Sequence, residues 1–467
     1  MDRFSWSNLK KSVWSISTML VRARRRNENQ LKSGESHQLS GDYSPGLDNA
    51  IFTISEMLEE PLISGLELDK EFLQGVLRES EADPYLEIVS VESSPGCNIG
   101  DNYMSAVSRL VINAETPSHQ SFQKSLLMKR QPASIARRQA FRCDPAFRNE
   151  AAAYRKVLPG LCHFAGCRLA FPQCLHASSQ FVVLEDLKQA GYEMADRAKG
   201  LDLAHAKLAL EELGRFHGTS LALKHVDPKS FSSLKTAVQE LVFVPEAVPV
   251  FGASLENSLR MALMGLEVYK AAGETIIQEA VHKMQILRGT VFQRMLYLVK
   301  PKEPLSVICH GDFYINNMLF RYENSEEPES VMFVDLQVCR YASLATDILY
   351  FLYSSLQPGV VSLYHDELIE VYQAALNAEI TRLAPGACEV SMKQIQDEIE
   401  NHALYGLIMA FLILPAVTAL PGATLNLDKV ESFSSDEFLE SAREILSPRY
   451  FERLRELVLD FVDRGYI

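Results

Sequence analysis

The sequence lacks an uninterrupted apolar run long enough to cross a membrane. Its longest run, residues 406–420, contains Pro415 and falls short of the roughly 18 residues that a span requires, so it predicts a buried helix. The eight cysteines lack the paired spacing of a disulfide framework, and no secretory signal pattern opens the sequence. We therefore expect a globular protein of a reducing compartment, the cytoplasm, with an ample core from its 47% hydrophobic composition.

Positive charge is also scarce, because 46 Lys and Arg residues face 60 Asp and Glu residues, for a formal net charge of −14. Phosphate backbones need clustered positive charge, so this balance argues against a nucleic-acid partner. The exception is residues 1–50, a basic, Ser-rich N-terminal extension that also holds both tryptophans, Trp6 and Trp14. An amphipathic helix there favours a membrane-surface anchor or mitochondrial targeting, and a disordered extension stays open as the alternative.

Residues 307–335 carry the strongest chemical signal. An apolar segment leads into a loop that contains Asp312, and Asn317 follows five residues later. The apolar segments 318–320 and 331–334 flank a polar turn and predict a hairpin with Asn317 at its entrance.

Asp335 stands at the exit of the same hairpin, so we expect it beside Asn317. Phosphoryl transfer from ATP needs a carboxylate that orients the attacking hydroxyl and accepts its proton, plus oxygen ligands that hold Mg²⁺ on the phosphates. We assign the catalytic role to Asp312 and the metal-ligand roles to Asn317 and Asp335. Each residue alone would be explained as a turn former, but the three together at this spacing favour an active site.

A nucleotide-binding region is predicted upstream of this stretch. The strand-like segments 85–91 and 107–112 flank a loop of small residues. Kinases cover ATP phosphates with such a loop, because backbone N–H groups must approach the anionic oxygens closely. Gly100, Asn102 and Ser105 are the candidate nucleotide-binding residues of this loop.

Lys129 ends the next apolar strand, residues 125–129. Asp144-Pro145 predicts the N-cap and first turn of a helix that carries Glu150 among apolar residues and stops at Pro159-Gly160. A phosphate-binding lysine needs a partner that fixes its long side chain, and Glu150 fits this role. The alternative for Lys129 is a solvated charge at the edge of a sheet.

Residues after Lys129 suggest a hinge followed by a mostly helical region. The apolar strand 181–184 leads into Glu185 and Leu187, whose main-chain groups would hold adenine. His217 lies on the buried face of a long helix and is expected to be a hydrogen-bonded core histidine. Asp347 opens another helix, either as its N-cap or as a group that braces the catalytic loop. Further helices are expected at 390–404, 406–420 and 451–462.

These motifs together resemble the ecdysteroid kinase-like family, also called choline-kinase-like, of the aminoglycoside phosphotransferase and protein-kinase-like superfamily. The resemblance covers about residues 55–467, and its motifs stand at 100–105, 126–129, 147–150, 183–187, 214–217, 310–317 and 334–337. It implies an α+β, bilobal protein-kinase-like fold with a small antiparallel-sheet lobe and a large, mostly helical lobe. It also implies ATP- and Mg²⁺-dependent phosphorylation of a small-molecule alcohol. Leu336 replaces the usual Phe and Tyr314 a common Trp, which leaves every functional group in place.

We expect residues 51–187 to form the nucleotide-binding lobe with a preceding helix, and residues 188–467 the catalytic and acceptor-binding lobe. Only eleven residues separate Asp335 from Asp347, too few for the activation segment of a protein kinase, which favours a small acceptor. An apolar, steroid-like alcohol is expected, and a kinase of choline or another polar alcohol, or an inactive binding protein, stays open. Oligomeric state stays open as well. The expected acceptor site draws on Tyr350, Phe351, Tyr353, Tyr405, Met409 and Phe411.

Overall fold

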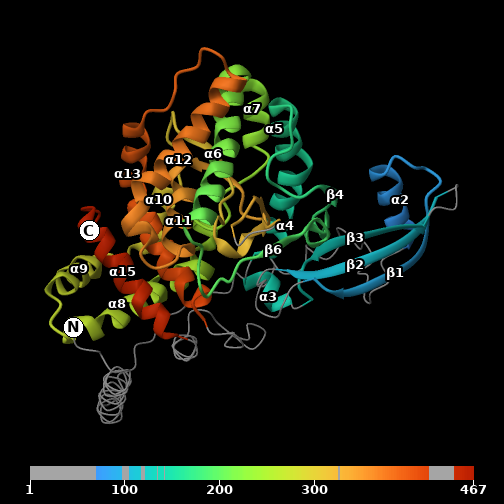
Figure 1. Ribbon diagram of the computed structural model, residues 1–467. Coiled ribbons are helices and arrows are strands. Elements are labelled where there is room, and N and C mark those ends of the chain that lie inside the picture. Colours follow the sequence, from blue (N-terminus) through green and yellow to red (C-terminus); the bar gives the residue numbers. More distant parts are fainter. Residues whose placement is uncertain are drawn as a thin grey trace, which may run out of the picture. The chain divides into compact units, whose positions relative to one another are not determined.

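The computed structural model describes residues 70–96, 105–116, 121–133, 135–140, 142–323, 327–419 and 446–467 (Figure 1). The chain divides into two compact units, residues 1–73 and 74–467. All elements below belong to the second unit, apart from the first turn of helix α2 (Lys70–Ser80). The extension 1–50 and the loop residues Gly100 and Asn102 lie outside the described residues.

The amino-terminal part of the second unit is built on a five-stranded antiparallel sheet (Figure 1). On β2 the buried residues Leu110, Ile112 and Ala114 alternate with more exposed ones, which is the period-two pattern of a strand with one face in the core. The strands expected at 85–91, 107–112, 125–129 and 181–184 are present, and the sheet has one further strand, β4. In sheet order they are β1 (Glu87–Pro95), β2 (Ala106–Glu115), β3 (Ser121–Arg130), β5 (Phe181–Glu185) and β4 (Cys174–Ala177).

The helix that carries Glu150 begins and ends differently from the sequence prediction. Helix α4 (Cys143–Ala152) starts after Arg142, whose φ is 51°, so Asp144 lies in its first turn and is not the N-cap. Pro159 does not stop the helix either. The chain continues through the π-helical turn η1 (Ala153–Val157) into α5 (Leu158–Ala165), because proline is tolerated in the first turn of a helix.

The carboxy-terminal part is largely helical (Figure 1). Its long helices are α6 (Leu203–Val226), α8 (Ala253–Ala271), α12 (Val360–Leu383), α13 (Met392–Val417) and α15 (Pro448–Asp463). Shorter ones are α7 (Pro228–Lys235), α9 (Thr275–Gln285), α10 (Val291–Leu298) and α11 (Ala345–Ser355), with α3 (Ile135–Ala140) before α4. Single turns are η2 (Leu187–Ala190), η3 (Pro245–Ala247), η4 (Val248–Gly252) and η5 (Ile315–Asn317).

Helix α13 corrects the expectation of two helices at 390–404 and 406–420. It is one helix with Pro415 in its last turn, and Gly406 in its middle packs against Leu349 of α11. Among the described residues, α13 is the one helix long and apolar enough to cross a membrane. Since 67% of its most apolar window is buried inside the protein, a core helix explains it as well.

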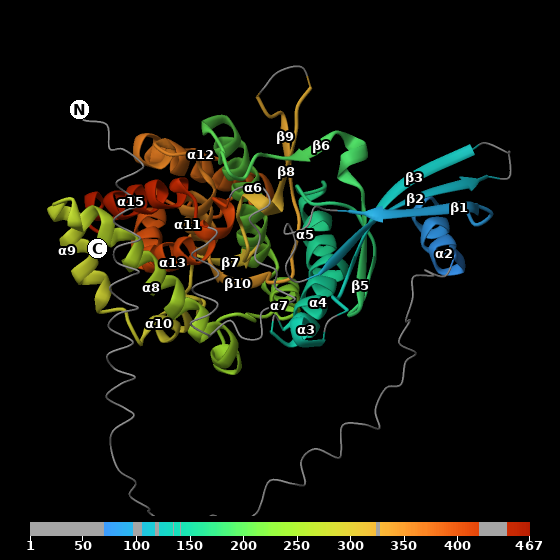
Figure 2. The ribbon, with the colours of Figure 1, turned by 90° about the horizontal axis from the view of Figure 1, so that it is seen from below.

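Two small sheets position the residues of the 307–335 stretch. Strand β7 (Ser306–Cys309) pairs antiparallel with β10 (Arg340–Ser343). Strands β6 (Tyr192–Met194), β8 (Met318–Arg321) and β9 (Ser330–Phe333) form the second sheet (Figure 2). The predicted hairpin is confirmed, with Met318 opposite Phe333, and the Val334 N–H donates to the Asn317 carbonyl at 3.0 Å.

Candidate active site

The loop that carries Asp312 follows β7 and requires glycine at position 311. Gly311 has a φ of +89°, in the left-handed region that side chains rarely adopt. A Cβ atom there would stand 2.1 Å from the Val338 carbonyl oxygen. The loop therefore turns sharply against the segment that leads into β10, and Asp312 comes directly after the turn.

Asp347 in the first turn of α11 braces this loop through hydrogen bonds to its main chain. Its carboxylate accepts the N–H groups of His310 at 2.6 Å and Gly311 at 2.9 Å. His217 Nε2 lies 3.3 Å from the same carboxylate, and its Nδ1 lies 2.8 Å from the Tyr372 hydroxyl. Burial opposes ionisation, but the contact with His217 holds the pKa of Asp347 below its usual value. Of the two expected roles, the structure shows the brace, and His217 is a hydrogen-bonded core histidine.

Both oxygens of the Asp312 carboxylate have donors. The Tyr350 hydroxyl donates to Oδ1 at 2.9 Å, and Nδ2 of Asn317 donates to Oδ2 at 2.9 Å. Burial, and then the nearby charge of Asp335, raise the pKa of Asp312 to about 6. A carboxylate with a raised pKa accepts a proton more readily than an ordinary aspartate, which suits a general base.

Lys129 of β3 meets two carboxylates from different elements. Its Nζ lies 2.7 Å from Oδ1 of Asp335 and 3.0 Å from the carboxylate of Glu150 on α4. Burial lowers the pKa of this lysine, but Asp335 and Glu150 outweigh burial and raise it. The structure thus brings together Lys129, Glu150, Asp312, Asn317 and Asp335, which the sequence places in four separate motifs.

Asp335 has a strained backbone. Its φ is +70°, and Ala82 and Arg142 are the other non-glycine residues with positive φ in the described ranges. Such conformations cost free energy and persist where the surroundings impose them, often at functional sites. Here the strained residue follows β9 and directs its carboxylate toward Lys129, beside the entrance of the hairpin.

The cluster has more negative than positive charge. Glu150 and Asp335 contact the cation of Lys129, Asp312 is close enough to feel the charge of Asp335, and Glu150 is fully buried. Burial raises the pKa of Glu150 to about 7, against the opposing effect of Lys129. Hard oxygen atoms in an excess of negative charge are the donors that Mg²⁺ prefers, so the residues present fit a divalent cation.

The hinge expected at 185–187 leaves one main-chain donor available. The Glu185 N–H donates to Gln173, and the Asp186 N–H donates to Ser125. For the Leu187 N–H, no acceptor is found within the part of the chain that the structure describes. The Glu185 side chain pairs with Arg168, so it is engaged away from the hinge backbone. Ser105 is buried directly before β2.

Four functional contacts were missed by the sequence reasoning. One is the hydrogen bond from Tyr350 to Asp312. Tyr350 stands three residues after Asp347, and this helical spacing places both residues on one face of α11. Asn149 is another, since its Nδ2 donates to the carbonyls of Gln337 and Cys339 and ties α4 to the segment after Asp335. The other two, the Asp186 carboxylate and the Arg340 guanidinium, have no periodic signal in the sequence.

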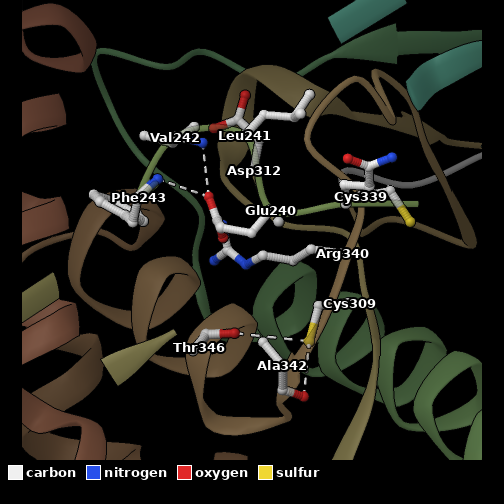
Figure 3. A network of polar contacts seen from close by, with 12 residues as sticks. Glu240, Leu241, Val242, Phe243, Cys309, Asp312, Cys339, Arg340, Ala342 and Thr346 are labelled. Carbon is white, nitrogen blue, oxygen red and sulfur yellow. Dashed lines mark hydrogen bonds and ion pairs between the residues drawn. The ribbon is translucent and has the colours of Figure 1, made fainter. Parts of the chain in front are cut away.

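Arg340 anchors a segment near Asp312 (Figure 3). Its buried guanidinium lies 3.2 Å from Glu240 and donates to the Tyr405 hydroxyl at 2.6 Å. Glu240 in turn accepts the N–H groups of Val242 and Phe243. The network therefore joins β10, α13 and the segment before η3 around one ion pair, in which Arg340 is buried and Glu240 partly exposed.

The six expected acceptor-site residues are all buried, and they differ in what they contact. Tyr350 contacts Asp312, and Tyr405 contacts Arg340. The Tyr353 hydroxyl donates to Asp460 of α15 instead, and the Phe351 ring packs on Phe313. Tyr353 and Phe351 are thus core residues here, and of these six residues Tyr350 is the one that contacts Asp312.

The ecdysteroid kinase-like family matches residues 99–384, and the chain belongs to this family. Membership supports the class of small-molecule kinases, which are phosphotransferases. No curated protein matches the chain.

Solved structures offer more distant likenesses. An ethanolamine kinase of Plasmodium vivax is 13% identical, with 81% of this chain and 85% of that chain covered and a TM-score of 0.34. An amicoumacin kinase in complex with AMP-PNP and Ca²⁺ is 12% identical, with 80% and 92% covered and a TM-score of 0.32. An ADP-bound aminoglycoside phosphotransferase is 14% identical, with 73% and 99% covered and a TM-score of 0.25. The assignment rests on the family match, because the TM-scores of these three structures are too low to support it.

Proposed function

We propose that the chain transfers the γ-phosphate of ATP to the hydroxyl of a neutral, largely apolar small molecule. The observation that carries this proposal is the convergence of Lys129, Asp312, Asn317 and Asp335. Lys129 reaches Asp335 at 2.7 Å although the two lie on separate elements far apart in the chain, and Asn317 reaches Asp312 at 2.9 Å within one motif. The family match supports the same class of reaction.

In this proposal Asp312 is the base. It accepts the proton of the acceptor hydroxyl while the alcohol oxygen bonds to the γ-phosphorus and the bond from that phosphorus to the oxygen of ADP breaks. Lys129 holds the phosphates as a fixed positive charge, and Glu150 steadies its side chain. The inactive binding protein is disfavoured, because all of these groups are present, with Lys129 in contact with Glu150 and Asp335 and with Asn317 in contact with Asp312.

Asn317 and Asp335 would hold Mg²⁺. The excess of carboxylates over cations in the cluster and the strained backbone of Asp335 support a divalent cation at this place. When bound, the ion supplies positive charge that offsets the phosphate oxygens. Asp312 and Lys129 do their parts from positions that the surrounding hydrogen bonds already fix.

We place the nucleotide between the hinge and the loop before β2. The Leu187 N–H, which has no acceptor among the described residues, and the carbonyl of Glu185 are suited to the edge of adenine. Gly100, Asn102 and Ser105 are the proposed residues over the phosphates, with Ser105 directly before β2. The hinge is stiffened by Asp186, whose carboxylate accepts from Ser125 at 2.6 Å.

The neutral acceptor is favoured by the groups next to Asp312. These are the Tyr350 phenol and the stacked ring of Tyr314, and the acidic neighbour that raises the pKa of Asp312 is Asp335, the proposed metal ligand. A cationic substrate such as choline calls for aromatic faces with clustered carboxylates. An apolar, steroid-like alcohol suits these phenol rings, because each carboxylate of the cluster has another role in the proposal: Asp312 is the base, Asp335 a metal ligand and Glu150 the partner of Lys129.

Calorimetry with AMP-PNP and Mg²⁺ present tests the choice of acceptor. We expect a hydroxylated steroid to bind the nucleotide-loaded protein and choline to give no heat of binding. Binding of choline without binding of the steroid would overturn the apolar acceptor. Failure of AMP-PNP itself to bind, with or without Mg²⁺, would overturn the kinase proposal.

A further inference from the structure

Helix α11 contacts the catalytic loop at two points one turn apart. Asp347 accepts the main-chain N–H groups of His310 and Gly311, and Tyr350 donates its hydroxyl to the Asp312 carboxylate. Residues three positions apart lie on the same face of a helix. One rigid element therefore fixes both the backbone of the loop and the side chain of its proposed base.

The Tyr350 phenol is itself held in place. The residue is 2% exposed, and its ring stacks on Tyr314 with centroids 5.6 Å apart and an angle of 4° between the planes. Tyr314 belongs to the catalytic loop, and its N–H donates to the Asp312 carbonyl at 3.1 Å. The stack thus ties the phenol to the same loop whose carboxylate it contacts.

The two donors on Asp312 act at different oxygens. Asn317 holds Oδ2 and Tyr350 holds Oδ1, so the plane of the carboxylate cannot turn without breaking one of the two contacts. Each carboxylate oxygen still has a second acceptor site for an incoming hydroxyl. Asn317 has a second task in the proposed reaction as a metal ligand, whereas Tyr350 lies on the opposite oxygen.

We propose that Tyr350 is a positioning residue for phosphoryl transfer, whose hydroxyl sets the orientation in which Asp312 meets the acceptor. This inference rests on the proposed function and adds a residue to it. A base that is misplaced by an ångström loses much of its effect, because proton transfer requires hydrogen-bond geometry in the transition state. Binding of the nucleotide uses other residues and does not depend on the phenol.

The chain offers a matched control on the same helix. Tyr353 is also buried, and its hydroxyl also donates to an aspartate, Asp460 of α15, at 2.8 Å. Tyr350→Phe and Tyr353→Phe therefore remove the same group from the same helix and leave a carboxylate with one donor fewer. The two variants differ in which carboxylate loses its donor.

Steady-state hydrolysis of MgATP, with water as the acceptor, needs no knowledge of the natural substrate. We expect Tyr350→Phe to lower kcat about 10- to 100-fold while KM for ATP and the affinity for AMP-PNP stay at wild-type values. Tyr353→Phe should keep the wild-type kcat. Wild-type turnover by Tyr350→Phe, or an equal loss of kcat in both variants, would overturn the inference.

A crystal structure of Tyr350→Phe supplies a readout that needs no turnover. The inference predicts that the Asp312 carboxylate turns away from its wild-type orientation while the Gly311 N–H stays on Asp347. A carboxylate that keeps its wild-type orientation would overturn the inference. A wild-type protein that moves phosphate to neither water nor any alcohol would overturn the proposed function, and the crystal structure would still decide the Tyr350 contact.

Discussion

At the scale of single residues, substitutions at two carboxylates of the cluster are expected to impair different steps, turnover in one case and nucleotide binding in the other. Asp312→Asn removes the proposed base but keeps the shape of the side chain, so kcat should fall by about 10²- to 10⁴-fold while AMP-PNP still binds. Asp335→Ala removes a proposed metal ligand and the partner of Lys129, so Mg²⁺-dependent binding of AMP-PNP should be lost. Kinetics and calorimetry on both variants separate these results.

The matched control for these variants is Asp397→Asn. Asp397 pairs with Lys393 on the exposed surface of α13, where an ion pair contributes little. Its kcat and nucleotide affinity should equal those of the wild type. Full turnover by Asp312→Asn, or unchanged metal dependence in Asp335→Ala, would contradict the assigned roles.

A second residue-scale prediction concerns Asp186 at the hinge. Although burial favours its neutral form, hydrogen bonds from Arg109 and Ser125 hold the pKa of Asp186 below its ordinary value. Because the pKa is lower in the folded than in the unfolded state, the ionised group contributes stability that is fully present above about pH 4 and is lost as the pH falls further.

Asp186→Asn should therefore lower the free energy of unfolding at neutral pH by about 1–2 kcal/mol. Urea unfolding of the variant and the wild type at a series of pH values measures the difference. The difference should stay constant down to about pH 4 and shrink below it. A difference that is the same at every pH would show that Asp186 acts without its charge.

At the scale of elements, the turn between β7 and the loop that carries Asp312 depends on Gly311. Gly311→Ala adds the strain of a left-handed alanine and a clash with the Val338 carbonyl, whereas Gly386→Ala adds the strain alone, because its Cβ meets nothing within 4 Å. The Gly386 variant should lose about 1–2 kcal/mol of unfolding free energy. The Gly311 variant should lose more unfolding free energy than the Gly386 variant, and it should also lose turnover. Equal losses of stability in urea would contradict a tight turn at Gly311.

Local pattern predicted some of these elements well. Two short apolar segments around a polar turn predicted the hairpin that puts Asn317 beside the residues after β9, and an apolar strand ending in lysine placed Lys129. Local pattern failed where tertiary packing decides. Pro159 lies in the first turn of α5 without ending the helix before it, and Gly406 packs against α11 inside a continuous α13.

The contacts that the sequence did not predict join residues far apart in the chain. Asn149 reaches Gln337 and Cys339, and Arg340 reaches Tyr405 and Glu240. Hydrogen bonds of this kind leave no periodic trace, because any polar residue of the right length at a buried position could make them. The contact of Tyr350 with Asp312 was the exception. Its signal in the sequence is the spacing of three residues between Asp347 and Tyr350, which puts both on one face of a helix.

At the scale of the whole molecule, the contact between Lys129 and Asp335 joins the five-stranded sheet to the hairpin of the largely helical part. A nucleotide with Mg²⁺ would bind both parts at once and so stabilise the folded protein by mass action. At about 100 times its dissociation constant, AMP-PNP with Mg²⁺ should add about 2.7 kcal/mol to the free energy of unfolding. Urea unfolding with and without the ligand checks this. The Asp335→Ala variant should show no increase in unfolding free energy when the ligand is added.

The central claim is that this cluster moves phosphate from ATP to a small alcohol. The most direct measurement is transfer of label from [γ-³²P]ATP to a panel of neutral and cationic alcohols, with the wild type and Asp312→Asn run side by side. The account predicts that the wild type labels a neutral, apolar alcohol and that Asp312→Asn does not, although it binds AMP-PNP. Equal labelling by the two proteins would contradict the account, because Asp312 would then have no part in the transfer.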